Sequence, residues 1–377
     1  MKASKIWISS LMFAWLSFSS SIFAQEDSGT PPIQWQSVLC EEYRVSDAFA
    51  YPLKKGGYII TGSINTSGSS DILVLKVNSK GSMIWKQEFG GEGSDIAGPS
   101  IESKNGEYCI VSGTLNVATQ FNSGKDAKCW IAAIDKEGSL LWQTEEALSD
   151  ETVGSYPLMI GEIKQKRDEF VLLGKASDRD VGLINFIMAI KKENDGFSSD
   201  GSLAGRSTLH SPFPITNEDM SVTIVMDGIR IRRYELTEGR QMKRWERRFL
   251  MDISEITDAV YMKNGCIVVG LLEDITRRKI ATFWLDSSGV IQWKKVLGNA
   301  YGYPRCVKSG NSDEYLIFSG SGVFKMTGNG ELEWKRAFDA FQSIHSIAPS
   351  FNGGYLLVGS KRGKLGIFLA EIQENGQ

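Results

Sequence analysis

The sequence predicts an all-β fold: a seven-bladed β-propeller of four-stranded blades, with the ring closed by the N-terminal strand that completes the last blade. Three observations lead to this prediction. A glycine turn recurs seven times, a β-type run recurs seven times, and one strand-like segment stands alone near the N-terminus. A repeat of about 40 to 50 residues that carries several short strands is typical of propeller blades.

The turn glycines set the period of the repeat. They are spaced 41 to 58 residues apart, which leaves room for four strands of ordinary length in each unit. Four of them continue as glycine-x-x-x-tryptophan, ending at Trp85, Trp142, Trp293 and Trp334. After Gly239 the tryptophan comes two residues late, as Trp245, and after Gly196 there is none. The seven glycines are Gly81, Gly138, Gly196, Gly239, Gly289, Gly330 and Gly376.

The second recurring element is a run rich in β-branched and aromatic residues, bounded by glycine, asparagine and aspartate. Such runs are typical of strands. They span residues 56–63, 106–113, 168–175, 218–225, 264–271, 313–320 and 353–360.

The two ends of the chain explain how the ring closes. The seventh turn glycine is followed by one residue, so the last unit lacks its fourth strand. The segment IQWQSVL (33–39) matches IQWKKVL (291–297) at five of seven positions and belongs to no other unit. We expect residues 33–39 to complete the last blade, which protects the exposed strand edges. Residues 33–377 then form a single propeller domain.

The N-terminus is typical of a secretory signal peptide. Lys2 and Lys5 precede the apolar segment from Ile6 to Ala24, and Ile22 and Ala24 occupy positions −3 and −1 of a plausible cleavage site before Gln25. We expect residues 1–24 to be removed, residues 25–32 to form a short leader, and the protein to be extracytoplasmic, either periplasmic or secreted. An uncleaved membrane anchor is the alternative. No later stretch is apolar enough to span a membrane.

Charge and cysteine content exclude several functions. The formal net charge is −3, and it becomes −5 without Lys2 and Lys5, so the chain is not a general nucleic-acid binder. The five cysteines form no CxxC pair, and the two histidines cannot complete a common zinc site with them. We therefore expect no metal and no cofactor. The cysteines are interpreted as small buried residues, two of which could form one disulfide, and this is favoured over a redox role.

The repeated tryptophans are interpreted as structural. Strand alternation places Trp85, Gln87 and Phe89 on one face. A tryptophan that occurs in six of seven units is more typical of packing between neighbouring blades than of one binding site.

The repeats resemble those of quinoprotein-like β-propellers. AIDKEGSLLWQ (133–143) is similar to the tryptophan-containing repeat of PQQ-dependent dehydrogenases and of the outer-membrane assembly lipoprotein BamB. Residues 56–85 are similar to repeats of secreted bacterial propellers, and the resemblance covers residues 33–377. It implies the fold more than an activity, because the repeats are scaffold. The chain departs from these families where chemistry would occur: it has seven units, no adjacent cysteine pair and no lipoprotein cysteine.

Three sets of residues are expected near the opening of the central channel. His210 and His345 each precede a proline by four residues, and could face a ligand or share a structural position. Asp47, Asp95 and Asp258 recur in SDAF, SDIA and TDAV; they could hold calcium, but acceptance of hydrogen bonds within the turn is favoured. Aromatic residues suit a sugar or a peptide, although packing between blades explains them equally well. They include Tyr51, Tyr156 and Tyr303.

A basic run at residues 229–249 is the other candidate site. It has a local charge of +5 and could bind an anionic lipid or polysaccharide. The alternative is a solvated outer hairpin whose charges protect a strand edge. The candidate residues are Arg230, Arg232, Arg233, Arg244, Arg247 and Arg248.

Together these features predict a monomeric, exported, non-enzymatic binding or scaffold propeller for a protein or glycan partner in the bacterial envelope. No catalytic motif occurs in a suitable context, so no catalytic residue is assigned. The alternative is an enzyme, either a divergent quinoprotein oxidoreductase or a polysaccharide-active propeller. An enzyme requires ionisable side chains that converge at the channel opening, with two acidic or histidine groups within hydrogen-bond reach.

Overall fold

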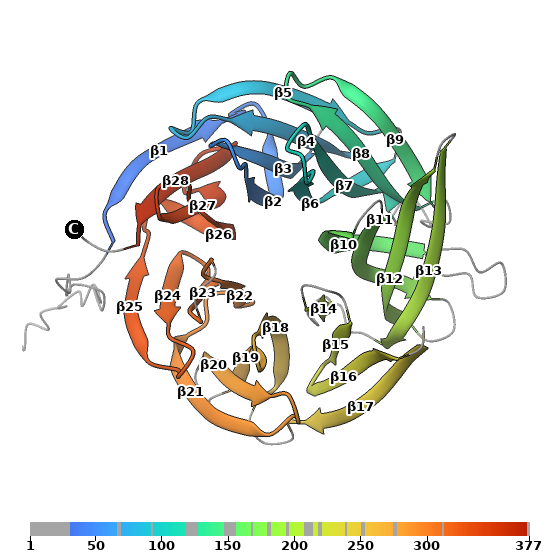
Figure 1. The fold of residues 1–377 in the computed structure, drawn as a ribbon. Coiled ribbons are helices and arrows are strands. Elements are labelled where there is room, and N and C mark those ends of the chain that lie inside the picture. The colour runs from blue at the N-terminus through green and yellow to red at the C-terminus, as the bar shows by residue number, and fades with distance from the viewer. Residues whose placement is uncertain are drawn as a thin grey trace, which may run out of the picture.

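A computed structural model describes most of the chain: residues 31–65, 69–91, 93–117, 127–146, 156–166, 169–178, 182–193, 196–206, 214–217, 221–237, 240–249, 253–273, 277–310 and 313–374. Every regular element in these segments is a strand, and the strands form seven four-stranded antiparallel sheets. The sheets stand around a common axis as the blades of a ring (Figure 1). The predicted all-β, seven-bladed propeller is confirmed. No described helix has the length and apolarity needed to cross a bilayer.

The first three blades follow the chain from the inner to the outer strand. Blade 1 contains β2 (Arg44–Pro52), β3 (Tyr58–Asn65), β4 (Ser70–Val77) and β5 (Met83–Phe89). Blade 2 contains β6 (Ser94–Glu102), β7 (Tyr108–Val117), β8 (Lys128–Asp135) and β9 (Leu140–Glu146). Blade 3 contains β10 (Tyr156–Lys166), β11 (Glu169–Asp178), β12 (Gly182–Glu193) and β13 (Gly196–Arg206).

The remaining blades continue in the same order. Blade 4 contains β14 (Ile215–Thr216), β15 (Val222–Asp227), β16 (Arg230–Thr237) and β17 (Arg240–Arg248). Blade 5 contains β18 (Glu255–Met262), β19 (Gly265–Glu273), β20 (Arg278–Asp286) and β21 (Ile291–Asn299). Blade 6 contains β22 (Arg305–Lys308), β23 (Tyr315–Ser319), β24 (Gly322–Met326) and β25 (Leu332–Ala337). Blade 7 contains β26 (Phe341–Pro349), β27 (Gly354–Lys361), β28 (Ile367–Gln373) and β1 (Ile33–Leu39).

The ring closes as the sequence predicts. Strand β1 pairs antiparallel with β28 and forms the outer strand of blade 7, from Ile33 opposite Ile372 to Leu39 opposite Ile367. The chain then enters blade 1, whose inner strand β2 lies beside β26 of blade 7. The first and last strands in chain order therefore share one sheet (Figure 1).

The unit without a tryptophan is still a complete blade. Strands β10 to β13 of blade 3 have 10 to 12 residues each and pair in unbroken order. The shortest inner strand is β14 of blade 4, with two residues. The missing tryptophan thus leaves the four-stranded plan of the blade unchanged.

The core lies between blades, not within them. Strand β3 is buried on both faces along nearly its whole length because each face of its sheet packs against an adjacent blade. Tyr58 and Leu75 of blade 1 share one apolar cluster with Leu356 and Ile367 of blade 7. Equivalent clusters among the described residues join blades 1 and 2, 2 and 3, 4 and 5, 5 and 6, and 6 and 7, so side chains from two sheets form each of these parts of the core.

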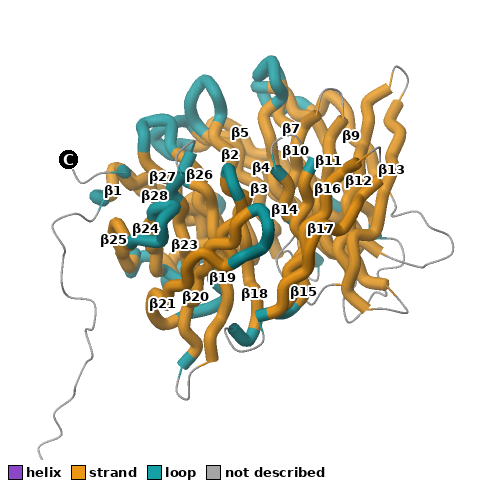
Figure 2. The backbone as a smooth tube through the Cα atoms, turned by 60° about the horizontal axis from the view of Figure 1, so that its bottom comes forward, coloured by secondary structure: helices purple, strands orange, loops and turns teal. Residues whose placement is uncertain are grey.

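The strands run between two faces of the ring, with loops and turns at both (Figure 2). We call the face at which the inner strands begin the start face; it also carries the connections between blades. The opposite side, where the inner strands end, is the end face. The turns before the outer strands, with Gly81 and its equivalents, lie at the end face.

Candidate functional site

In four of the blades, the tryptophan of the outer strand packs on the turn glycine of the next blade. An added Cβ at Gly138 would lie 3.0 Å from the ring of Trp85, and one at Gly330 would lie 3.0 Å from the ring of Trp293. Trp35 covers Gly81 in the same way, and Trp245 covers Gly289. Packing between neighbouring blades is therefore confirmed for these four tryptophans, and their rings are not free as a ligand platform.

Hydrogen bonds complete these junctions. Between blades 1 and 2, Trp85 Nε1 donates to the Lys136 carbonyl at 2.9 Å, and Lys76 Nζ donates to the same oxygen at 2.7 Å. Gln87 Nε2 donates to the carbonyl of Gly138 at 3.0 Å. Side chains at the outer edge of one blade thus hydrogen-bond the main-chain carbonyls of the turn in the next blade.

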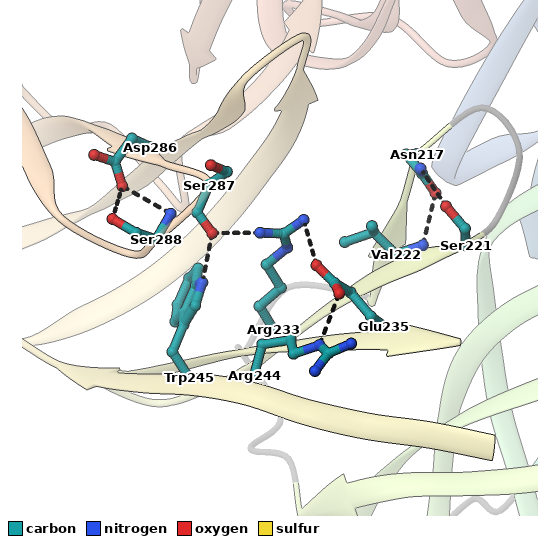
Figure 3. A network of polar contacts seen from close by, with 10 residues as sticks. All are labelled: Asn217, Ser221, Val222, Arg233, Glu235, Arg244, Trp245, Asp286, Ser287 and Ser288. Atoms are coloured by element: carbon teal, nitrogen blue, oxygen red, sulfur yellow. Dashed lines mark hydrogen bonds and ion pairs between the residues drawn. The ribbon is translucent and has the colours of Figure 1, made fainter. Parts of the chain in front are cut away.

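The basic run forms the equivalent junction between blades 4 and 5 (Figure 3). Trp245 Nε1 donates to the Ser287 carbonyl at 2.9 Å, and Arg233 donates to the same oxygen. Arg247 Nη1 donates to the carbonyl of Gly289 at 3.0 Å. Arg233 and Arg247 therefore occupy the positions of Lys76 and Gln87 in the first junction.

Carboxylates on the same hairpin pair with the other arginines. Glu235 binds Arg233 at 2.8 Å and Arg244 at 2.7 Å. Glu246 binds Arg232 at 2.9 Å and lies 3.5 Å from Arg248, while Arg230 lies at the start of β16. The arrangement fits the alternative of a charged outer hairpin better than a continuous patch for an anionic partner.

A second group of charges gathers around the ring axis. We call it the axial ionic cluster; it contains Asp47, Glu162, Lys175, Asp258, Arg305 and His345, from blades 1, 3, 5, 6 and 7. The pairing register shifts beside four of these residues. A bulge at each of these points bends the inner strand and changes the direction of its side chains. Asp47, Asp258 and Arg305 lie in the first half of their inner strands, on the start-face side, whereas His345 is at the middle of β26 and Glu162 is just past the middle of β10.

Asp258 is the most firmly held member of the axial ionic cluster. Its Oδ1 accepts a hydrogen bond from the Ala259 amide at 2.9 Å, and its Oδ2 accepts one from the Cys306 amide of blade 6 at 2.8 Å. Burial raises the pKa of Asp258 to about 6, although these hydrogen bonds and the charge of Arg305 oppose the rise. Asp258 therefore also fastens blade 5 to blade 6.

Lys175 and Arg305 bring positive charge to the same region. Lys175 is 4% exposed, and burial, reinforced by the charge of Arg305, lowers its pKa to about 8. The carboxylates of Glu255 and Asp258 act in the opposite direction. Arg305 Nη1 donates to the main-chain carbonyl of His345 at 2.9 Å, so its guanidinium is anchored to blade 7.

His345 and Asp47 complete the axial ionic cluster at the junction of blades 7 and 1. Burial lowers the pKa of His345, and the nearby charge of Asp47 opposes this effect. The imidazole Nδ1 is buried without a hydrogen-bond partner. Within the described segments, no hydrogen bond or ion pair joins His345 to a carboxylate.

The other candidate residues do not join this cluster. Asp95 is buried and accepts hydrogen bonds from the amides of Gly91 at 3.0 Å and Asn116 at 2.9 Å, the favoured structural role. Tyr303 is on the start face, whereas Tyr51 is near the end of β2, on the opposite face. His210 and the side chain of Tyr156 lie outside the described residues. No group of metal-ligating side chains is found among the residues that are described.

Sequence reasoning missed Glu162, Lys175 and Arg305. The signal for Lys175 was present: in the five other recurring runs that contain this glycine, the next residue is Ser63, Thr114, Leu271, Ser321 or Ser360, and it is lysine only here. The cysteines offer no chemistry of their own. All five are unpaired, four are buried, and burial raises the pKa of the Cys109 thiol to about 12, which makes it unreactive.

Comparisons with known proteins support the fold alone. No protein-family model and no curated protein matches the chain. The solved structure of Sqt1 from Chaetomium thermophilum aligns with a TM-score of 0.51 at 8% identity, covering 88% of this chain and 96% of Sqt1. Sqt1 bound to the N-terminus of the ribosomal protein L10 aligns with a TM-score of 0.55 at 9% identity, covering 92% of this chain and all of that one. At such low identity the likeness describes architecture.

Proposed function

We propose that this protein is a non-enzymatic binding propeller that holds a protein partner at its start face. The observation that carries the proposal is the axial ionic cluster, in which charges of both signs are fixed by main-chain atoms. Asp258 is held by two amides and Arg305 by a carbonyl, so neither is engaged in an acid–histidine pair. Fixed charges of alternating sign suit recognition of a charged polypeptide segment.

Two further observations support a binding role. Trp85, Trp245 and Arg247 are engaged at blade junctions, whereas the axial ionic cluster contains side chains that do not recur from blade to blade. A propeller of the same architecture, Sqt1, binds the N-terminus of a ribosomal protein. Repeat scaffolds of one fold carry different partners on the surfaces where their repeats diverge.

The proposal includes the setting read from the sequence. Residues 1–24 would direct export, and the mature protein would act as a monomer in the bacterial envelope, within the quinoprotein-like group that its repeats resemble. Fractionation of the native host tests this part. Recovery of the full-length protein in the cytoplasm, with residues 1–24 retained, would contradict export.

Affinity capture from envelope extracts tests the binding role. The mature protein and the variant Asp47→Asn are compared, because Asp47 faces His345 without a structural hydrogen bond of its own. Glu137→Gln is the matched control, an exposed carboxylate in an end-face turn. We expect a protein partner to be retained by the mature protein and the control but lost by Asp47→Asn.

Other outcomes separate the alternatives. Recovery of free monomer alone would remove the support for a scaffold. A partner held equally by Asp47→Asn would place the binding surface elsewhere. Capture of a glycan instead of a protein would identify the other partner class predicted from the sequence.

A further inference from the structure

A pocket lies on the start face where blades 7 and 1 meet. Its volume is about 290 Å³, small for a ligand site but enough for a group of several atoms. Arg44 and Val45 of β2 form one side, Gln342 of β26 and Ser360 of β27 form another, and the loop from Gly363 to Gly366 lines the rim. None of these residues belongs to the axial ionic cluster.

The loop between β27 and β28 is fixed in an unusual backbone shape. Gly363 has a φ of +71° and Gly366 a φ of +91°, both in the region that favours glycine. The Gly366 amide donates to the Tyr43 carbonyl at 2.9 Å, which ties the loop to the segment entering blade 1. A Cβ at Gly363 would meet nothing within 4 Å, so the rim above the pocket is open.

The polar side chains that line the pocket are either positively charged or neutral, and each can donate hydrogen bonds. The guanidinium of Arg44 forms no ion pair with any described residue. Lys364 adds an ammonium, which lies 3.7 Å from Glu41. Ser360 brings a hydroxyl and Gln342 a side-chain amide. With Glu41 offsetting Lys364, one uncompensated positive charge remains.

The rest of the lining is apolar. Val45 is buried at the base of β2, whereas Leu365 is 49% exposed at the rim. A ligand that fills the pocket must therefore present an anionic head to Arg44 and an aliphatic part to Val45 and Leu365. A single uncompensated charge matches a monoanion, and the planar guanidinium fork matches a carboxylate.

We propose that this pocket binds a carboxylate carried on a short aliphatic group. Arg44 forms the paired hydrogen bonds to the carboxylate, and Ser360 and Gln342 donate to its outward lone pairs. The carboxylate can come from the C-terminus of a peptide or from a free short-chain acid. The proposal rests on the pocket alone and holds whether or not a partner occupies the axial ionic cluster.

Calorimetric titration with N-acetyl-L-leucine tests the pocket, because this probe joins a carboxylate to a branched aliphatic side chain. N-acetyl-L-leucinamide is the matched probe, with the same shape and no charge. We expect the acid to bind at least about tenfold more tightly than the amide, since charge-assisted hydrogen bonds are roughly twice as strong as neutral ones. Titration with 4-methylpentanoate separates the two sources: equal affinity favours a free acid, and weaker binding favours a peptide terminus.

Two variants locate the site. Arg44→Gln should weaken binding of the acid by about tenfold and leave the amide unaffected. Arg362→Gln is the control, an exposed arginine on the same loop that does not line the pocket, and it should bind as the unmodified protein does. Equal affinity for acid and amide, no heat of binding at millimolar probe, or equal loss in both variants would overturn the proposal. The comparison of acid with amide uses the unmodified protein, so it remains decisive if Arg44→Gln does not fold.

Discussion

Replacing Gly289 with alanine tests whether the tryptophan of one blade requires bare backbone in the next. Gly289 has a φ of +81°, and an added Cβ would lie 2.8 to 3.0 Å from three ring atoms of Trp245. The left-handed backbone costs about 1–2 kcal/mol for a residue with a Cβ. Forcing the indole aside adds about 1–3 kcal/mol, the usual effect of overpacking. The expected loss in the free energy of unfolding is therefore about 2–5 kcal/mol.

Gly353→Ala supplies the control that isolates the ring contact. Gly353 has a φ of +83°, but its added Cβ would meet nothing within 4 Å. It should lose only the backbone contribution, about 1–2 kcal/mol, and the reduced entropy of the unfolded chain affects both variants alike. Urea denaturation of the two variants, with unchanged dependence on urea concentration, measures the difference. If both lose the same free energy, the turn glycine is required for its φ alone and the packing argument fails.

Three other perturbations have defined outcomes. Deletion of β1 should lower the melting temperature of the whole ring, because blade 7 loses its outer strand; an unchanged melting temperature would refute the closure. Lys175→Met should raise the free energy of unfolding at pH 7 by up to about 3 kcal/mol, since burial lowers the pKa of Lys175 from 10.5 to about 8. Between pH 8 and pH 10.5 the unfolded chain binds more protons than the folded protein, so the stability of the unmodified protein should rise over this range. Its stability deficit relative to Lys175→Met should vanish above about pH 10. A deficit that stays constant when denaturation is measured at several pH values would refute the assignment. Lys325→Met should cost about 3–5 kcal/mol at pH 7, because its ammonium, nearly buried, lies 2.9 to 3.0 Å from three glutamates; an unchanged free energy of unfolding in urea denaturation would contradict this.

The repeat made the fold predictable from sequence. Gly289 and Trp245 belong to different blades, yet the local sequence around each of them recurs in most units. A junction that is formed several times is therefore visible as a pattern in the sequence. The closing strand was predictable for the same reason, because residues 33–39 repeat residues 291–297. These features depend on local strings that occur in nearly every unit.

The candidate site is different because it depends on contacts that occur once. Asp95 and Asp258 stand in similar strings, but Asp95 binds the amides of its own blade whereas Asp258 binds that of Cys306 in the next. Lys175 meets Asp258 and Arg305 from blades that follow it by more than 80 residues in the chain. Only the closed ring brings such residues together.

The function of the basic run could not be decided from its sequence for a related reason. Counting residues 229–249 gives a surplus of arginine, but cross-strand pairing sets Arg232 opposite Glu246, and two arginines donate to carbonyls of the following blade. A charge count along the chain does not register main-chain acceptors. Pairing across strands decides which charges remain available to a partner.

The pairing of β1 with β28 sets the order of events when the ring forms. Trp35 donates to Glu371, a residue 336 positions later in the chain, so β1 leaves the ribosome long before β28 and cannot pair with it until β28 has been made. Contacts of such high sequence separation slow folding, because the chain entropy must be lost before the contact is gained. Until β1 and β28 pair, the free edges of both strands are open to other chains. The last step of folding is therefore also the step most exposed to aggregation.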